Sequence, residues 1–178
     1  MNEGKMLVVI DMQNDFITGP LGSEEAKVIV PNVIQKIKDY KSNSYTIFYT
    51  QDTHDKSNYH LSHEGKRLPI EHCIYNTEGW KIVPEIYDEI NGYRGSIRVT
   101  KHAFGHSGWH YINDEVNTIE IIGVCIDICV VSNALILRSV FPEADIIVDA
   151  SCCAGTTVEN HNKALDVMEC CHIDIINR

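Results

Sequence analysis

Three residues of this sequence have side chains that could together activate a nucleophile: the carboxylate of Asp11, the ammonium of Lys101 and the thiol of Cys129. Each follows an apolar run that predicts a buried strand. Because parallel strands bring their carboxyl ends to one edge of a sheet, we expect these side chains to meet there. A nearby cation or a helix N-terminus lowers the pKa of a thiol, which is ordinarily about 8.5. Asp11 is then placed to take the thiol proton and to deliver it to a departing amine.

Each of these residues also has a structural interpretation. Cysteine is among the most frequently buried residue types, so Cys129 taken alone is more often a core residue than a nucleophile. An aspartate at a strand end is often a cap or a turn residue. Lys101 taken alone is a solvated surface lysine. Two adjacent cysteine pairs, Cys152-Cys153 and Cys170-Cys171, fall beside or within apolar segments, and we interpret them as core residues.

A second group of polar residues follows the second predicted strand. Asp52 and His54 place an oxygen ligand and an imidazole on one tight turn. A further histidine from the loop that follows, which contains His60, His63 and His72, would complete a site for zinc, iron or manganese. The alternative is a solvated histidine-rich loop, because the spacing matches no zinc-finger pattern.

Six short runs rich in Val, Ile, Tyr and Phe predict the strands that position these residues: 6–10, 45–50, 97–100, 118–124, 146–148 and 173–176. Helical periodicity occurs in 31–37, in 130–140, where Pro142 prevents continuation, and from Thr156 onward. This alternation predicts a single α/β domain over residues 1–178, doubly wound, with three αβα layers and a six-stranded, mainly parallel sheet. The polar region 51–95 interrupts the pattern, and we expect it to carry the metal and substrate loops.

Composition restricts the classes of function. The 178 residues are 44% hydrophobic and 22% charged, as in ordinary globular proteins. A net charge of −10 argues against nucleic acid or an anionic membrane as a partner. No apolar run approaches the 18 residues of a membrane helix, and the seven cysteines do not resemble a secreted disulfide framework. We expect a cytoplasmic enzyme with reduced thiols.

Three segments together resemble the isochorismatase-like cysteine hydrolases, and among them the nicotinamidase/pyrazinamidase branch. Residues 8–16 (VVIDMQNDF) are similar to the family's first strand and its catalytic aspartate, Asp11. Residues 99–104 (VTKHAF) are similar to the strand that delivers the catalytic lysine, Lys101. Residues 123–130 (GVCIDICV) are similar to the signature that carries the nucleophile, Cys129. The resemblance covers nearly the full length of the chain.

The resemblance implies further site residues. A non-proline cis peptide is expected at Val124-Cys125, and the backbone N–H groups of Cys125 and Cys129 would form an oxyanion hole. Asp52, His54 and His72 match the family's metal ligands, although one additional residue separates Pro69 from His72. The fourth ligand is expected to be Glu64, with His60 as the alternative.

The activity that this resemblance implies is metal-assisted hydrolysis of nicotinamide to nicotinate and ammonia, a step of NAD salvage, through a cysteine thioester. The cofactor is one divalent ion, zinc first, with iron or manganese as alternatives. Phe16 and Phe104 are expected to form aromatic pocket walls, and homo-oligomers are expected because the family often forms them. Residues 74–77 (IYNT) replace a usual Gly-Thr pair and are expected to reshape the pocket, so two alternatives stay open. One is another amide hydrolase acting on a carbamoyl or ureido compound, and the other is a catalytically silent binding or assembly relative.

Overall fold

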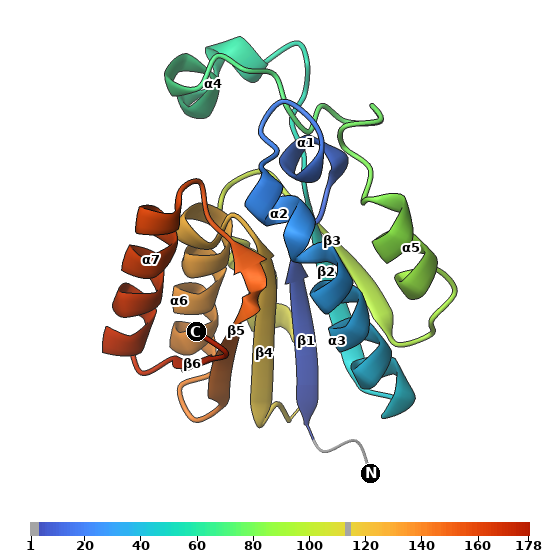
Figure 1. Cartoon of the computed structure of the whole chain (residues 1–178), viewed down its shortest axis with the longest axis vertical. Coiled ribbons are helices and arrows are strands. Elements are labelled where there is room, and N and C mark those ends of the chain that lie inside the picture. The colour runs from blue at the N-terminus through green and yellow to red at the C-terminus, as the bar shows by residue number, and fades with distance from the viewer. Residues whose placement is uncertain (1–3, 113–114) are drawn as a thin grey trace.

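A six-stranded, all-parallel sheet forms the centre of the protein (Figure 1), whose computed structural model describes residues 4–112 and 115–178. The strand order is β3-β2-β1-β4-β5-β6, so the chain leaves the central β1 in one direction and later returns to its other side. The strands are β1 (Lys5–Ile10), β2 (Thr46–Asp52), β3 (Ser96–Lys101), β4 (Thr118–Val124), β5 (Asp145–Ala154) and β6 (Asp174–Ile176). The predicted α/β class and six-stranded sheet are confirmed, and every pairing is parallel.

Helices cover both faces of the sheet. Those of the described residues are α1 (Asn14–Ile17), α2 (Glu24–Val28), α3 (Val30–Ser42), α4 (His63–Arg67), α5 (Pro84–Ile90), α6 (Val131–Val140) and α7 (Val158–Cys170). Short 3-10 turns occur at Tyr59–Leu61 (η1) and Ser107–Tyr111 (η2), and a π-helical turn at Ile126–Val130 (η3). Two hydrophobic clusters form the core, one beneath α3 and α5 and the other beneath α6 and α7.

Strand β1 shows why both faces are buried. Leu7 and Val9 face the cluster under α3, whereas Met6, Val8 and Ile10 face the cluster under α6 and α7. Successive side chains of a strand point to opposite faces, so a continuous apolar run fits a strand that is covered on both sides. The apolar runs in the sequence therefore predicted these central strands correctly.

Most helix predictions are confirmed. Helix α3 carries Pro31 in its first turn, and α6 ends before Pro142. Helix α7, predicted from Thr156 onward, begins at Val158, because Thr157 is the N-cap and accepts a hydrogen bond from Asn160 N at 3.0 Å. Region 51–95, expected as loops, also contains η1, α4 and α5. Among residues 4–112 and 115–178, no helix is both long and apolar enough to span a bilayer.

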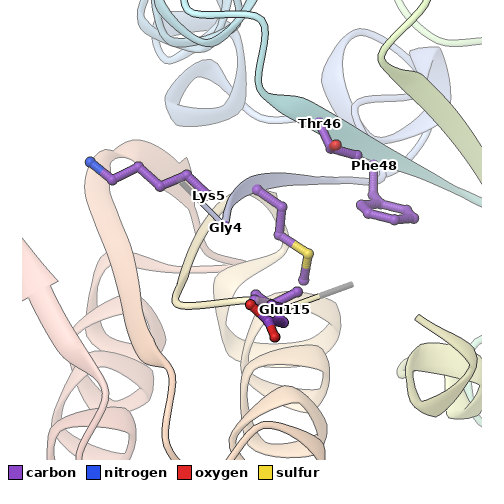
Figure 2. A pocket seen from close by; sticks show the side chains of 7 residues that line it. Gly4, Lys5, Thr46, Phe48 and Glu115 are labelled. Atoms are coloured by element: carbon purple, nitrogen blue, oxygen red, sulfur yellow. The ribbon is translucent and has the colours of Figure 1, made fainter. Parts of the chain in front are cut away.

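The carboxyl ends of the strands all lie at one edge of the sheet. In Figure 1, α1 and α4 lie beyond these ends, at the top of the view. At the opposite edge, a cavity of about 250 Å³ is bounded by residues of β1 and β2 and by Glu115 (Figure 2). The Lys5 side chain extends away from Phe48 and Glu115 in that view. This cavity is remote from the residues with candidate chemistry, which gather at the carboxyl edge.

Gly123 allows β4 to lie close to β1. Its φ is +122°, and a Cβ at this position would lie 2.1 Å from the carbonyl oxygen of Ile10. Gly92 provides a matched control, because its φ is also positive, at +76°, but a Cβ there would meet no atom within 4 Å.

We predict that Gly123→Ala destabilises the fold by about 3 kcal/mol or more, because backbone strain and a steric clash add. Gly92→Ala is expected to cost about 1–2 kcal/mol from backbone strain alone. Urea unfolding of the two variants and the parent protein measures the difference. Equal losses of unfolding free energy would show that close approach of β4 to β1 does not require Gly123.

Candidate active site

Asp11, Lys101 and Cys129 meet at the carboxyl edge of the sheet, as the sequence predicted. Lys101 Nζ lies 2.7 Å from Asp11 Oδ2 and 3.5 Å from Cys129 Sγ. Asp11 follows β1 with a φ of +48°, a conformation that Asp tolerates better than most residues. Thr50, from β2, donates a hydrogen bond from Oγ1 to Asp11 Oδ1 at 2.6 Å and accepts one from Asp11 N at 3.0 Å. The three side chains are almost completely buried, with Cys129 5% exposed.

The protonation state of the thiol differs from the expectation. Burial, and after it the negative charge of Asp11, raises the pKa of Cys129 well above its ordinary value, and Lys101 offsets this only in part. Burial also raises the pKa of Asp11, against the opposing charge of Lys101. The pKa of Lys101 is raised despite its burial, because Asp11, Cys129 and Asp52 surround it. Burial therefore favours the neutral form of the thiol, opposite in direction to the lowered thiol pKa that the sequence led us to expect.

Four candidate metal ligands form a second cluster next to this site. One ligand atom from each of Asp52, His54, Glu64 and His72 lies within 4.8 Å of all the others. Asp52 Oδ2 lies 3.1 Å from His54 Nε2, and Glu64 Oε1 lies 3.4 Å from His72 Nε2. Ligand atoms around a tetrahedral zinc ion are about 3.3 Å apart, which is close to these two separations. Two other pairs are longer, with His72 Nε2 3.8 Å from Asp52 Oδ2 and His54 Nε2 3.9 Å from Glu64 Oε2. His60, the alternative ligand, is exposed and instead contacts Glu71 at 2.9 Å.

Neighbouring groups orient the candidate ligands. His72 Nδ1 lies 2.9 Å from the carbonyl oxygen of Ile70 and 3.1 Å from the Tyr59 hydroxyl. Nδ1 is thus the proton-bearing nitrogen, which leaves the lone pair on Nε2, the atom that faces Glu64. Gln13 holds the backbone of Asp52 from both sides, accepting from Asp52 N at 2.7 Å and donating to Asp52 O at 2.9 Å.

The charge balance of the two clusters fits a divalent cation. Asp11, Asp52 and Glu64 supply three carboxylates, and Lys101 supplies one ammonium that contacts two of them. Two negative formal charges remain, which a divalent ion would neutralise. Two imidazoles with two carboxylates suit zinc, iron and manganese. The pKa of Asp52 is lowered despite its burial, chiefly by the hydrogen bond from His54 and by the charge of Lys101, so this carboxylate is ionised.

Asp52 connects the two clusters. Its Oδ2 lies among the candidate metal ligands, and its Oδ1 lies 3.1 Å from Lys101 Nζ. Asp52 thus contacts both Lys101, which balances the charge of Asp11, and the imidazole of His54. Asp52, at the end of β2, therefore links the candidate metal site to the ion pair beside the thiol.

One pocket of about 870 Å³ is lined by Cys129 and by all four candidate metal ligands, whereas Asp11 and Lys101 are not among its lining residues. Its walls include Cys129 and Cys125 on one side and Asp52, His54, Glu64 and His72 on another. Phe16 and Phe104 also line it, but Phe16 is buried, whereas Phe104 is 44% exposed. None of residues 74–77 lies among the described lining residues, but Ile74 forms a bridge with His54, so the expected effect of this segment on the pocket stays a prediction.

The turn that carries Cys129 has an unusual backbone. The peptide bond between Val124 and Cys125 is cis, as the resemblance implied, and η3 follows it directly. Cys129 lies in this turn, just before α6 begins at Val131. Of the cysteine pairs expected in the core, Cys152 and Cys153 are buried in β5, whereas Cys170 and Cys171 are exposed at the end of α7.

Several residues of the site were not predicted from the sequence. Gln13, Thr50 and Tyr59 orient candidate ligands and the carboxylate of Asp11. Gln13 is a polar residue in an otherwise buried segment, a signal that sequence reasoning could have used. Other unpredicted side chains form the walls of the pocket: Leu21, Ala26, Arg67, Leu68, His102 and Ile128.

The chain is similar in sequence and in fold to several known nicotinamidases and pyrazinamidases. The chain is 24% identical to a nicotinamidase of Saccharomyces cerevisiae over 226 residues, covering 98% of this chain and 100% of the yeast protein. The crystal structure of a nicotinamidase/pyrazinamidase from Bacillus subtilis has a TM-score of 0.86 at 21% identity, covering 98% of this chain and 99% of that one. A pyrazinamidase of Pyrococcus horikoshii in complex with zinc has a TM-score of 0.83 at 25% identity, with the same coverage.

The family model described as the isochorismatase domain matches residues 5–177, which is nearly the whole chain. With its all-parallel sheet and the cluster of acidic, basic and thiol groups at the carboxyl edge, the chain belongs to the isochorismatase family.

Proposed function

We propose that this protein is a metal-assisted amidohydrolase that converts nicotinamide to nicotinate and ammonia. The observation that carries the proposal is the shared pocket, in which the Cys129 thiol and the Asp52-His54-Glu64-His72 cluster line one cavity. The likeness to nicotinamidases, at low identity, supports the same substrate. A homo-oligomer stays a prediction, as does zinc as the ion.

In the proposed reaction, Cys129 Sγ attacks the carboxamide carbon while its proton passes to Asp11. Because burial raises the pKa of the thiol, this transfer accompanies the attack, and Lys101 stabilises the charge that forms on sulfur. Backbone N–H groups of Cys125 and Cys129 would hold the carbonyl oxygen as its negative charge develops. Asp11 then returns the proton to the departing nitrogen, ammonia leaves, and water hydrolyses the thioester to nicotinate and the free thiol.

The candidate metal site would position the substrate. A divalent ion bound there would supply a Lewis-acidic charge that attracts the pyridine nitrogen. Asp52, His54, Glu64 and His72 would hold that ion, with Tyr59 and Ile70 O fixing the ring of His72. Phe16, whose ring centroid lies 5.5 Å from that of His72, offers an aromatic wall beside the site.

The size of the pocket favours one second candidate. At about 870 Å³ the cavity lies towards the upper end of the range for drug-sized ligands, so it has room for an amide larger than a single ring. A carbamoyl or ureido compound could use the same attack by Cys129. Ammonia release from a panel of amides, with nicotinamide among them, distinguishes these substrates. No turnover of nicotinamide by the metal-loaded protein, with turnover of another amide, would favour the second candidate.

We predict that Cys129→Ala lowers the turnover number for nicotinamide by roughly 10³-fold or more, because the attacking atom is removed. Cys171→Ser is the control, since this exposed cysteine lies at the end of α7, away from the pocket. Ammonia release measures the activity, and circular dichroism confirms that both variants are folded. Substantial turnover by folded Cys129→Ala protein would contradict nucleophilic catalysis.

We predict that the parent protein binds one zinc ion per chain and that His72→Ala reduces zinc affinity by roughly 100-fold or more, since a ligand is lost. His60→Ala is the matched control, because His60 lies outside the cluster. Metal content after dialysis against a graded chelator, determined by mass spectrometry, gives the affinities independently of activity. Equal zinc retention by the two variants would rule out this ligand set. Activity that persists after complete metal removal would argue against the role of the metal in catalysis.

A further inference from the structure

Asn133, on α6, is a fully buried polar residue that belongs to neither cluster. Its side chain uses both ends. Nδ2 donates to the carbonyl oxygens of Cys129 at 2.8 Å and Phe104 at 3.0 Å. Oδ1 accepts from His106 N and from Trp109 Nε1, both at 2.9 Å. Every hydrogen-bonding capacity of this amide is therefore used, with both donors and both acceptor sites engaged.

Three of the four partners belong to one segment, residues 103–109, which we call the lip. The lip follows β3, and its first residues, Ala103 and Phe104, line the pocket on the side of Cys129. It also packs directly on α6, since a Cβ added at Gly105 would lie 2.5 Å from Ile136 Cδ1. The fourth partner is the backbone carbonyl of Cys129 itself. Asn133 thus joins the pocket wall to the residue that would attack the substrate.

The lip also contacts Lys101. Lys101 Nζ lies 3.1 Å from the carbonyl oxygen of Ala103 and 3.5 Å from Cys129 Sγ. Ala103, whose carbonyl oxygen contacts Lys101, directly precedes Phe104, whose carbonyl oxygen accepts a hydrogen bond from Asn133. A displacement of the lip would therefore move one of the groups that hold the ammonium beside the thiol.

We propose that Asn133 is a positioning residue, which holds the lip against the Cys129 turn and so sets the opening through which a substrate reaches the thiol. The proposal rests on the proposed function insofar as Cys129 is the attacking residue. Asparagine suits this role because it alone offers two donors and a two-site acceptor in a short side chain. An aspartate would keep the acceptor for His106 N and Trp109 Nε1, but would place an acceptor against the two carbonyl oxygens.

The test compares Asn133→Asp, Asn133→Ala and Trp109→Phe with the control Ser139→Ala. Ser139 is exposed on the same helix, and its hydroxyl donates to Leu135 O rather than to the lip. The readouts are kcat and KM for nicotinamide, zinc content, and the rates at which iodoacetamide and a bulky fluorescein maleimide modify Cys129. Tandem mass spectrometry separates modification of Cys129 from that of Cys125. All measurements are made well below the melting temperature of each variant.

We expect both Asn133 variants to lower kcat/KM by about tenfold or more, because small displacements of reacting groups are costly. In both variants, the ratio of the iodoacetamide rate to the fluorescein maleimide rate at Cys129 should fall severalfold. Zinc content should stay at the parent value. Trp109→Phe, which removes one of the four bonds, should shift both quantities in the same direction by about two- to threefold. Ser139→Ala should match the parent.

The proposal would be overturned if Asn133→Asp folds and keeps the kcat/KM and the reagent preference of the parent protein. It would also be overturned if the losses of kcat/KM among the variants simply parallel their losses of melting temperature. If neither Asn133 variant folds, Trp109→Phe decides, since unchanged reagent preference there would overturn the proposal. If the parent protein fails to turn over nicotinamide, the proposed substrate is wrong. The alkylation rates still test Asn133 in that case, because they require no substrate.

Discussion

The buried ammonium of Lys101 is the charge around which the candidate site is arranged. Burying an isolated ion costs several kcal/mol even after structural relaxation, so Lys101 requires compensating partners. Asp11 and Asp52 supply them at 2.7 and 3.1 Å, and the three residues come from the ends of β1, β2 and β3. These strands are neighbours in the sheet, and their register places Asp52 opposite Lys101. The ion triad therefore depends on the parallel sheet.

The same triad connects the thiol to the candidate metal site. Lys101 contacts Cys129 Sγ, and Asp52 extends its second oxygen to the imidazole of His54. Gln13 bonds both the N–H and the C=O of Asp52, and it also donates to Trp80 O at 2.8 Å. It thereby ties the segment after β1 to the end of β2. With its backbone held in this way, Asp52 has little freedom to rearrange when a ligand enters the pocket.

Much of this arrangement was predictable because it follows from strand ends. Asp11, Asp52 and Lys101 stand directly at or after apolar runs, and parallel strands deliver such residues to one edge. Glu64 was the expected fourth ligand and His60 the alternative, but the sequence left both open because both lie in the polar region 51–95 and no periodicity distinguishes them. The structure places Glu64 in the short helix α4 facing His72, whereas His60 faces Glu71.

The limits of sequence reasoning are clearest for groups whose behaviour depends on depth of burial. A nearby cation and a helix N-terminus predicted a lowered thiol pKa, but the burial of the thiol and the charge of Asp11 raise that pKa instead. Likewise, Cys170 and Cys171 lie in an apolar segment but fall at the exposed end of α7. The role of Asn133 could not be predicted from the sequence, because three of its four partners lie 24 to 29 residues earlier in the chain.

In the proposed reaction, a thiol with a raised pKa beside a buried carboxylate suits an amide substrate better than one with a better leaving group. An amide nitrogen leaves only after it is protonated, so the proton taken from the thiol has to stay near the reacting carbon. Asp11 is fully buried, and burial raises its pKa, which favours holding that proton over releasing it. Thr50 fixes one oxygen of Asp11, and Lys101 contacts the other. Burial therefore has two effects in the proposed reaction. It raises the pKa of the Cys129 thiol, and it helps Asp11 to keep the proton until ammonia leaves.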